Sequence, residues 1–346
     1  MLFSIYIRSF SRASLPVYFF RGGKTRKPLN TEECGDFILK PGVVAIKSLD
    51  ELGLKPEQRA ALEEVRRRLA EDFGLREIIT VAALRRARAA RNTLFGRPVK
   101  TDREAAAFVE VRGFCLLMPL RGVPLPSLSA ADGGAVWADD FRCTDQAWAW
   151  KETLPGRKLC AYVKLIRNRG TFIGWRLYPA FLALYGAGDL EEEYEAGRIS
   201  KAERELAAIV AERGPIDSRS LWRLARPLFG GERHRFLAAL ERLQTLFVVT
   251  VSGGSLEGWS RHTWDLVERW APPGVLQGIP SRREARRAIL RQTLSNCAAA
   301  DERLLRSLLR WPAGELAEAL ADLEAEGAAR RVRVEGQRSP WWAGPD

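Results

Sequence analysis

The sequence has few of the residues that build metal and disulfide sites. It contains only two histidines, His234 and His262, among 346 residues, so we expect no zinc site of the histidine and cysteine type. Its five cysteines are an odd number, and no two of them form a C-x-x-C pair. Scattered cysteines of this kind are typical of reduced thiols in a cytosolic protein. We therefore expect no metal, no cofactor and a cytoplasmic location.

Long apolar runs are also missing. The apolar stretches 2–7 and 15–20 are separated by Arg8 and Arg12, and neither approaches the roughly 18 residues that span a bilayer. We therefore expect no membrane segment. No acidic residue precedes Glu32. This pattern predicts a disordered basic tail over residues 1–47, with a targeting segment and a misassigned start as the alternatives.

Lysine is scarce, and arginine carries most of the positive charge. Ten of the 55 basic residues are lysine, which leaves 45 arginines and a net charge of +12. Residues 76–121 hold ten basic and four acidic residues, and residues 1–47 hold eight and three, so these segments carry +6 and +5. Codon bias in a GC-rich genome explains the arginine count better than it explains the clustering. The clustering favours a polyanionic partner, and we expect double-stranded DNA.

Residues 201–254 predict helix, short strand, helix, helix, strand and a Gly-rich tip. Gly214 and Pro215 end the first helix, and Ser218 is the expected cap of the second. The third helix has an apolar stripe at intervals of four, three and four, formed by Phe236, Leu240, Leu243 and Phe247. A strand is expected over 247–251, followed by a turn at Gly253 and Gly254. This order is typical of a winged helix.

A similar order recurs near the C-terminus. Helices are expected over 284–294, 301–309 and 314–326, and Val332 and Val334 then alternate with Arg331 and Arg333 as in a half-buried strand. The predicted fold is therefore α+β, mainly α, with tandem winged-helix units, each a helix-turn-helix with a β-hairpin wing. Ordinary amphipathic helices with hairpins, and winged helices that bind proteins, remain the alternatives.

An aromatic-rich block over residues 109–185 precedes the first of these units. It contains G-F-C-L-L-M-P at 113–119, D-Q-A-W-A-W-K at 145–151, L-C-A-Y-V-K at 159–164, G-T-F-I at 170–173 and Y-P-A-F at 178–181. The order of these motifs, with the winged unit after them, resembles the AlkZ-related proteins of the AlkZ/YcaQ superfamily of winged-helix DNA glycosylases. The resemblance covers about residues 105–280.

The resemblance implies a DNA-binding protein that excises alkylated or crosslinked bases. It also implies a Gln-x-Gln or Gln-x-Asp pair that holds the attacking water and stabilises the cationic sugar. The matching position, after a helix expected over 102–112, reads Gly-Phe-Cys-Leu-Leu-Met and has no amide or carboxylate. The usual catalytic pair is therefore missing.

The candidate catalytic residues that remain in this block are Asp145, Gln146 and Lys151. Asp145 and Gln146 pair a carboxylate with an amide beside Trp148 and Trp150, whose rings are candidates for stacking on an extruded base. The alternative is that the two tryptophans pack one face of a strand and that Asp145 caps a turn or helix.

The predicted DNA contacts are arginines of the two units. Arg235 and Arg242 lie seven residues apart and share one face of the third helix, while Arg261 and His262 belong to its wing. Arg331 and Arg333 are the corresponding residues of the second wing. No base-reading motif is present, so we expect contacts to phosphate and a nucleoid-associated protein.

The predicted domains are the tail at 1–47, a helical or winged-helix-like domain at 48–122, an aromatic-rich region at 123–200, and winged-helix domains at 201–275 and 281–346. The function predicted from them is that of a glycosylase-like DNA-binding protein with uncertain catalytic activity. A non-enzymatic winged-helix regulator is the alternative, and a protein-interaction scaffold is a third possibility. Release of free base and salt-dependent DNA binding separate the three.

Overall fold

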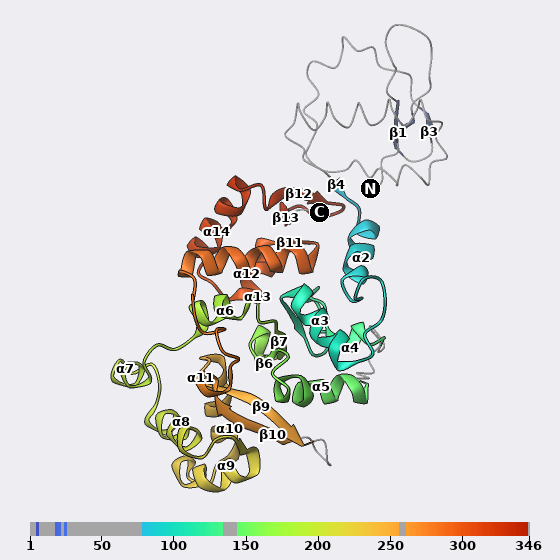
Figure 1. Ribbon diagram of the computed structural model, residues 1–346. Coiled ribbons are helices and arrows are strands. Elements are labelled where there is room, and N and C mark those ends of the chain that lie inside the picture. Colours follow the sequence, from blue (N-terminus) through green and yellow to red (C-terminus); the bar gives the residue numbers. More distant parts are fainter. Residues whose placement is uncertain are drawn as a thin grey trace. The chain divides into compact units, whose positions relative to one another are not determined.

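The computed structural model describes residues 78–133, 144–255 and 261–344, together with the backbone of three short strands, β1 (Ile5–Tyr6), β2 (Tyr18–Arg21) and β3 (Lys24–Thr25) (Figure 1). Apart from these strands, the predicted tail at 1–47 lies outside the described residues. Contacts divide the chain into two units, 1–83 with 331–341 and 84–330 with 342–346. The fold is a mixture of helices and strands, as the α+β prediction requires. The predicted domain boundaries stay a prediction.

In the first unit, β4 (Ile78–Ile79) pairs in parallel with β12 (Arg330–Val334). Val332 and Val334 are buried, whereas Arg331 and Arg333 are exposed. The alternation predicted for this strand is therefore confirmed.

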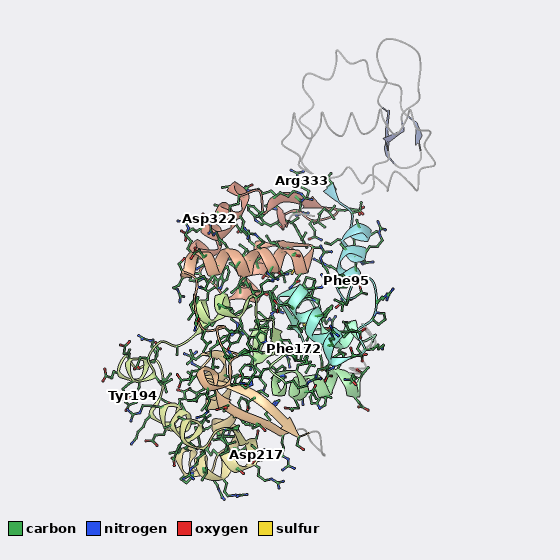
Figure 2. All side chains as sticks on the ribbon, in the orientation of Figure 1. Phe95, Phe172, Tyr194, Asp217, Asp322 and Arg333 are labelled. Carbon is green, nitrogen blue, oxygen red and sulfur yellow. The ribbon has the colours of Figure 1, made fainter. Side chains whose placement is uncertain are left out.

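A three-stranded sheet lies at the centre of the second unit, with strand order β5 (Phe114–Leu116), β7 (Gly170–Ile173) and β6 (Ala161–Lys164). Successive residues of a strand face opposite sides of the sheet. Phe114 and Leu116 belong to one hydrophobic cluster and Cys115 to another. Both faces are thus covered, and Phe172, labelled in Figure 2, is fully buried.

Helices on each side of the sheet supply these two clusters. One cluster contains residues of α6 (Tyr178–Tyr185), α12 (Arg282–Cys297), α13 (Glu302–Leu309) and α14 (Ala313–Ala325). The other contains residues of α3 (Asp102–Arg112), α4 (Leu128–Ala131) and α5 (Asp145–Gly156), and of the unit that begins at residue 201. The remaining elements of this part are α2 (Val81–Ala90), η2 (Ile166–Asn168), α7 (Leu190–Glu195), β11 (Ala299–Asp301) and β13 (Trp341–Ala343).

Helix α3 has the bounds expected from the sequence. Thr101 and Glu104 form a reciprocal capping box at its start. Gly113 ends the helix with a backbone φ of +66°, a conformation that glycine adopts without steric cost. Strand β5 follows directly, so the chain enters the central sheet at the position where the family resemblance places the catalytic pair.

Residues 201–270 contain the predicted helix, short strand, helix, helix and strand in the predicted order, together with a short 3-10 helix, a second long strand and a final helical turn. These are α8 (Lys201–Arg213), β8 (Ile216–Asp217), α9 (Ser218–Ala225), η3 (Arg226–Phe229), α10 (Arg233–Thr245), β9 (Val249–Ser255), β10 (Arg261–Leu266) and α11 (Val267–Trp270). The three strands form one antiparallel sheet in the order β8, β10, β9.

Two local predictions for this unit are wrong. The cap of α9 is Asp217, whose carboxylate accepts from the backbone N–H groups of Arg219 and Ser220, while the Ser218 hydroxyl donates to the backbone carbonyl of His262. A carboxylate one residue earlier reaches the same free amides, so either residue type satisfies the sequence rule. Gly253 and Gly254 lie inside β9 and not in a turn.

Candidate nucleic-acid interface

The strand that replaces the expected catalytic pair is part of the core. Phe114, Cys115 and Leu116 are each 0% exposed, and burial raises the pKa of the Cys115 thiol well above its usual range. The strand therefore presents no amide, carboxylate or thiolate to a substrate. Its side chains fill the space on both faces of the sheet.

The residues predicted for catalysis and stacking all lie on helix α5. Thr144 caps this helix by accepting from the backbone N–H of Ala147. Asp145 and Gln146 are exposed in its first turn, whereas Lys151 is buried. The structure therefore does not bring these three side chains into one cleft.

The two tryptophans of α5 differ in their surroundings. Trp150 is 0% exposed and donates its indole N–H to the carboxylate of Asp102 at 3.0 Å, so its ring is a core element and not a stacking surface. Trp148 is 43% exposed, and the ammonium group of Lys151 lies 4.2 Å from its ring centroid. Trp148 alone keeps an accessible ring.

The structure joins two of the predicted residues, Lys151 and His262, through a third that the sequence did not point to. Glu152 is 1% exposed; one of its carboxylate oxygens accepts from Lys151 Nζ at 2.9 Å, and the other lies 2.9 Å from His262 Nδ1. Burial raises the pKa of Glu152, but hydrogen bonds and charges from His262 and Lys151 outweigh burial, and the pKa lies below its usual range. We call Lys151, Glu152 and His262 the buried ionic cluster.

The buried ionic cluster connects helix α5 to the β9–β10 hairpin. His262 lies on β10, with ring centroids 5.9 Å from Tyr162 and 5.5 Å from Trp264. A histidine predicted to reach phosphate is thus only partly exposed and is held against the core. The sequence offers little indication of this contact, because Glu152 and His262 are 110 positions apart and meet only when α5 packs against the hairpin.

The paired glycines of β9 allow this close approach. A Cβ atom on Gly254 would lie 2.2 Å from an oxygen of the Glu152 carboxylate, and one on Gly156 would lie 3.3 Å from the Cα of Gly253. Position 254 therefore needs glycine because helix α5 packs on it. A Cβ atom on Gly253 would make an ordinary contact of 3.4 Å with the Cα of Gly156, but the φ of +150° at Gly253 is one that other residues rarely adopt.

The surface of α9, η3 and α10 is rich in exposed arginine. Arg235, predicted from the sequence, pairs with Glu232 at 3.0 Å. Arg261 on β10, also predicted, is partly buried. Hydrogen bonds from Ser220 lower the pKa of Asp217, and the charge of Arg261 adds a smaller effect in the same direction. Arg242 is exposed, as predicted. Four further exposed arginines were not predicted from the sequence, namely Arg219, Arg223, Arg226 and Arg233. For these four and for Arg242 we find no ion pair within the described parts of the chain. We call these five residues the open arginines.

A second arginine-rich surface, on α12, is neutralised by α14. Arg283 contacts Asp322 in a bidentate pair at 2.7 and 2.8 Å, and Glu326 accepts from both Arg287 and Arg291 at 2.5 and 2.6 Å. Arg286 lies 3.0 Å from Glu315. The charge of this surface is therefore compensated within the fold. Figure 2 labels Asp322 on α14.

Arg331 and Arg333, the predicted contacts of the second wing, are exposed on β12 in the other unit. They stay predicted contacts. Among residues 78–133, 144–255 and 261–344, no group of three His, Cys, Asp or Glu side chains is placed to hold a metal ion. Within the same residues, every helix is too short or too polar to cross a bilayer.

Comparison with known proteins gives a family match and a similar solved structure. A family model described as AlkZ related matches residues 99–310. No curated protein matches the chain. Among solved structures, the chain is similar to the Streptomyces sahachiroi DNA glycosylase AlkZ, with 16% identity over 77% of this chain and 70% of that one, and a TM-score of 0.49.

Proposed function

Because this chain belongs to the AlkZ-related family, we propose that it is a glycosylase-like protein that binds double-stranded DNA through tandem winged-helix units. The first unit comprises α8, α9, α10 and the β9–β10 hairpin. The second comprises α12, α13, α14 and the strands that follow them. The observation that carries the proposal is the set of open arginines on α9, η3 and α10.

The open arginines suit phosphate better than they suit a protein surface of mixed charge. The charge of an arginine without an internal acidic partner is not offset by a neighbouring carboxylate, and its planar guanidinium group binds phosphate oxygens in a bidentate manner. Each phosphate contact releases counterions and gives a slope of about −0.9 in log affinity against log salt. Binding that depends on shape and charge is the mode we propose, because no base-reading motif accompanies these arginines.

Base excision is a second candidate function, favoured by family membership and by one feature of α5. Asp145 and Gln146 are exposed in the first turn of α5, and Trp148, which follows Asp145 by one helical turn, is partly exposed. A carboxylate beside an accessible ring is able to hold water near a stacked base. The buried β5 strand offers no competing catalytic group.

Two measurements on the purified protein test these proposals. Titration of a labelled duplex at several salt concentrations is expected to show binding that weakens as salt rises, and salt-insensitive or absent binding would favour the scaffold hypothesis. Incubation with a duplex that carries one alkylated purine then tests excision. Release of free base that is lost in Asp145→Asn, with duplex binding retained, supports the enzyme. Intact DNA under tight binding supports a non-enzymatic regulator.

A further inference from the structure

Phe95 is by far the most exposed large apolar residue in the part of the chain that the structure describes. Its side chain is 83% exposed, whereas the others of this kind lie between 43% and 48%. We find no aromatic or cation–π partner for its ring within the described residues. Single exposed apolar residues are common on protein surfaces, so the exposure of Phe95 points to a role only together with the conformation of its backbone.

The backbone at Phe95 adds a second anomaly. Phe95 has a φ of +51° and Gly96 a φ of +80°, and the N–H groups of Leu94 and Arg97 each donate to the other's carbonyl, at 2.9 and 3.0 Å. Positive φ at both central residues defines a type I′ turn, in which the first position normally takes Asn, Asp or Gly. A bulky aromatic residue there is strained, and such strain concentrates at functional sites.

The turn is firmly attached to the fold. The Asn92 side chain accepts from the backbone N–H of Ser127 at 3.0 Å, and Arg112 donates to the carbonyl of Thr93 at 3.1 Å. Beyond the turn, Val99 is fully buried and its N–H donates to the carbonyl of Ala131 at 2.8 Å. The ring is therefore presented from a rigid hairpin and not from a loose loop. Figure 2 labels Phe95.

The charge around the turn indicates what the ring meets. Residues 91–100 contain three basic residues and no acid. Of these, Lys100 pairs with Asp132 at 3.1 Å, and Glu104 of α3 lines the same hollow as Phe95 and Arg97. Arg97, two positions from Phe95, is exposed and has no ion pair within the described residues, and the same holds for Arg103 on α3. An apolar wedge flanked by arginine is the arrangement with which proteins unstack a base step while holding the adjacent phosphates.

We propose that Phe95 is a wedge that inserts between stacked bases of duplex DNA, with Arg97 contacting the neighbouring phosphate. This inference rests on the proposed DNA binding and adds a residue that opens the base stack. The family match begins at residue 99, so the wedge lies outside the segment that the match covers. A base step weakened by a lesion or mismatch costs less to unstack, so the wedge favours such sites.

The test uses the full chain and a duplex with 2-aminopurine next to a mismatch, because 2-aminopurine fluoresces more strongly when it is unstacked. Wild type is expected to raise the fluorescence at least twofold at saturation. Phe95→Asn is expected to abolish the rise while weakening duplex affinity less than tenfold, because the arginine contacts remain. Phe95→Trp keeps an aromatic ring at this position and is expected to keep the increase in fluorescence. Ile279→Ala, which removes another exposed apolar side chain, is the matched control and is expected to behave as wild type.

Each contrary result overturns the inference. A wild type that binds the duplex without a rise, or a Phe95→Asn variant that gives the full rise, contradicts the wedge while leaving DNA binding intact. Absence of duplex binding contradicts the proposed function as well. Thermal unfolding supplies an independent measurement: asparagine tolerates positive φ, so Phe95→Asn is expected to unfold at the wild-type temperature or above. A lower unfolding temperature would assign Phe95 a structural role and reject the wedge.

Discussion

Two regions of the molecule are rich in charge but differ in how their arginines are paired. One is formed by α9, η3 and α10, and the other by α12 and α14. On α12, acidic residues of α14 and Glu326, which follows α14 directly, pair with Arg283, Arg286, Arg287 and Arg291. On α9, η3 and α10, the open arginines have no such partners within the described residues. Arginine content alone therefore does not locate an anion-binding surface; the position of the acids decides it.

The paired region shows why this difference was not visible in the sequence. Arg283 and Asp322 are 39 positions apart, so no short-range rule joins them. On α10, in contrast, Arg235 pairs with the nearby Glu232, and we find no ion pair for Arg233 or Arg242 within the described residues. The comparison leads to three predictions, which remove charge first from the open arginines, then from the buried ionic cluster, and last from the paired surface.

The largest effect is expected from loss of four open arginines. Replacement of Arg219, Arg223, Arg233 and Arg242 by Ala removes four potential phosphate contacts, so the slope of log affinity against log salt is expected to fall by about 3.6, which is four times the value of about 0.9 per contact. Duplex titration over a salt series measures it. Thermal unfolding serves as the control, and we expect it to stay near wild type because all four side chains are exposed. An unchanged slope would place the DNA elsewhere.

The second effect concerns the buried ionic cluster, in which the Glu152 carboxylate contacts Lys151 and His262 inside the fold. Glu152→Gln leaves Lys151 buried without its carboxylate, and loss of one partner of a buried pair costs about 3 kcal/mol in the free energy of unfolding. Urea denaturation measures the loss. Glu205→Gln breaks the exposed pair with Lys201 and is expected to cost about 0.5 kcal/mol or less. Equal losses in the two variants would mean that the cluster does not hold α5 to the hairpin.

The pH dependence of stability gives a separate check on the same carboxylate. The pKa of Glu152 is lower in the folded protein than its ordinary value of 4.5, so the folded state binds its proton less readily than the unfolded state does. The stabilisation is therefore complete above about pH 4.5 and is lost as the pH falls below that value. Glu152→Gln is expected to show a shallower loss of stability on acidification than wild type shows.

The sequence predicted the parts of this fold that depend on local patterns. The apolar stripe of α10, the bounds of α3 and the alternation along β12 follow from periodicity and capping alone. Helix α5 was not predicted, because Trp148 and Trp150 are two positions apart and match a strand as well as a helix. The burial and the partners of Trp150 and Glu152 depend on contacts with α3 and β10, and the sequence alone does not show these contacts. The candidate site was therefore found in part: of the five open arginines only Arg242 was predicted, because charge pairing depends on tertiary contacts, and the buried ionic cluster required tertiary contacts as well.

The smallest effect is expected from the paired surface, and it decides whether the comparison is correct. Arg287 and Arg291 are partly exposed, at 34% and 48% of their side chains, yet both pair with Glu326. Replacement of both by Ala is expected to leave the salt slope of duplex binding unchanged and to cost about 1 kcal/mol or less in the free energy of unfolding, the usual range for exposed ion pairs. The same duplex titration and urea denaturation measure the two quantities. A slope that falls by about 1.8, or 0.9 for each arginine, would show that paired arginines also meet phosphate. The distinction between open and paired arginines would then carry no functional meaning, and accessibility alone would define the DNA-binding surface.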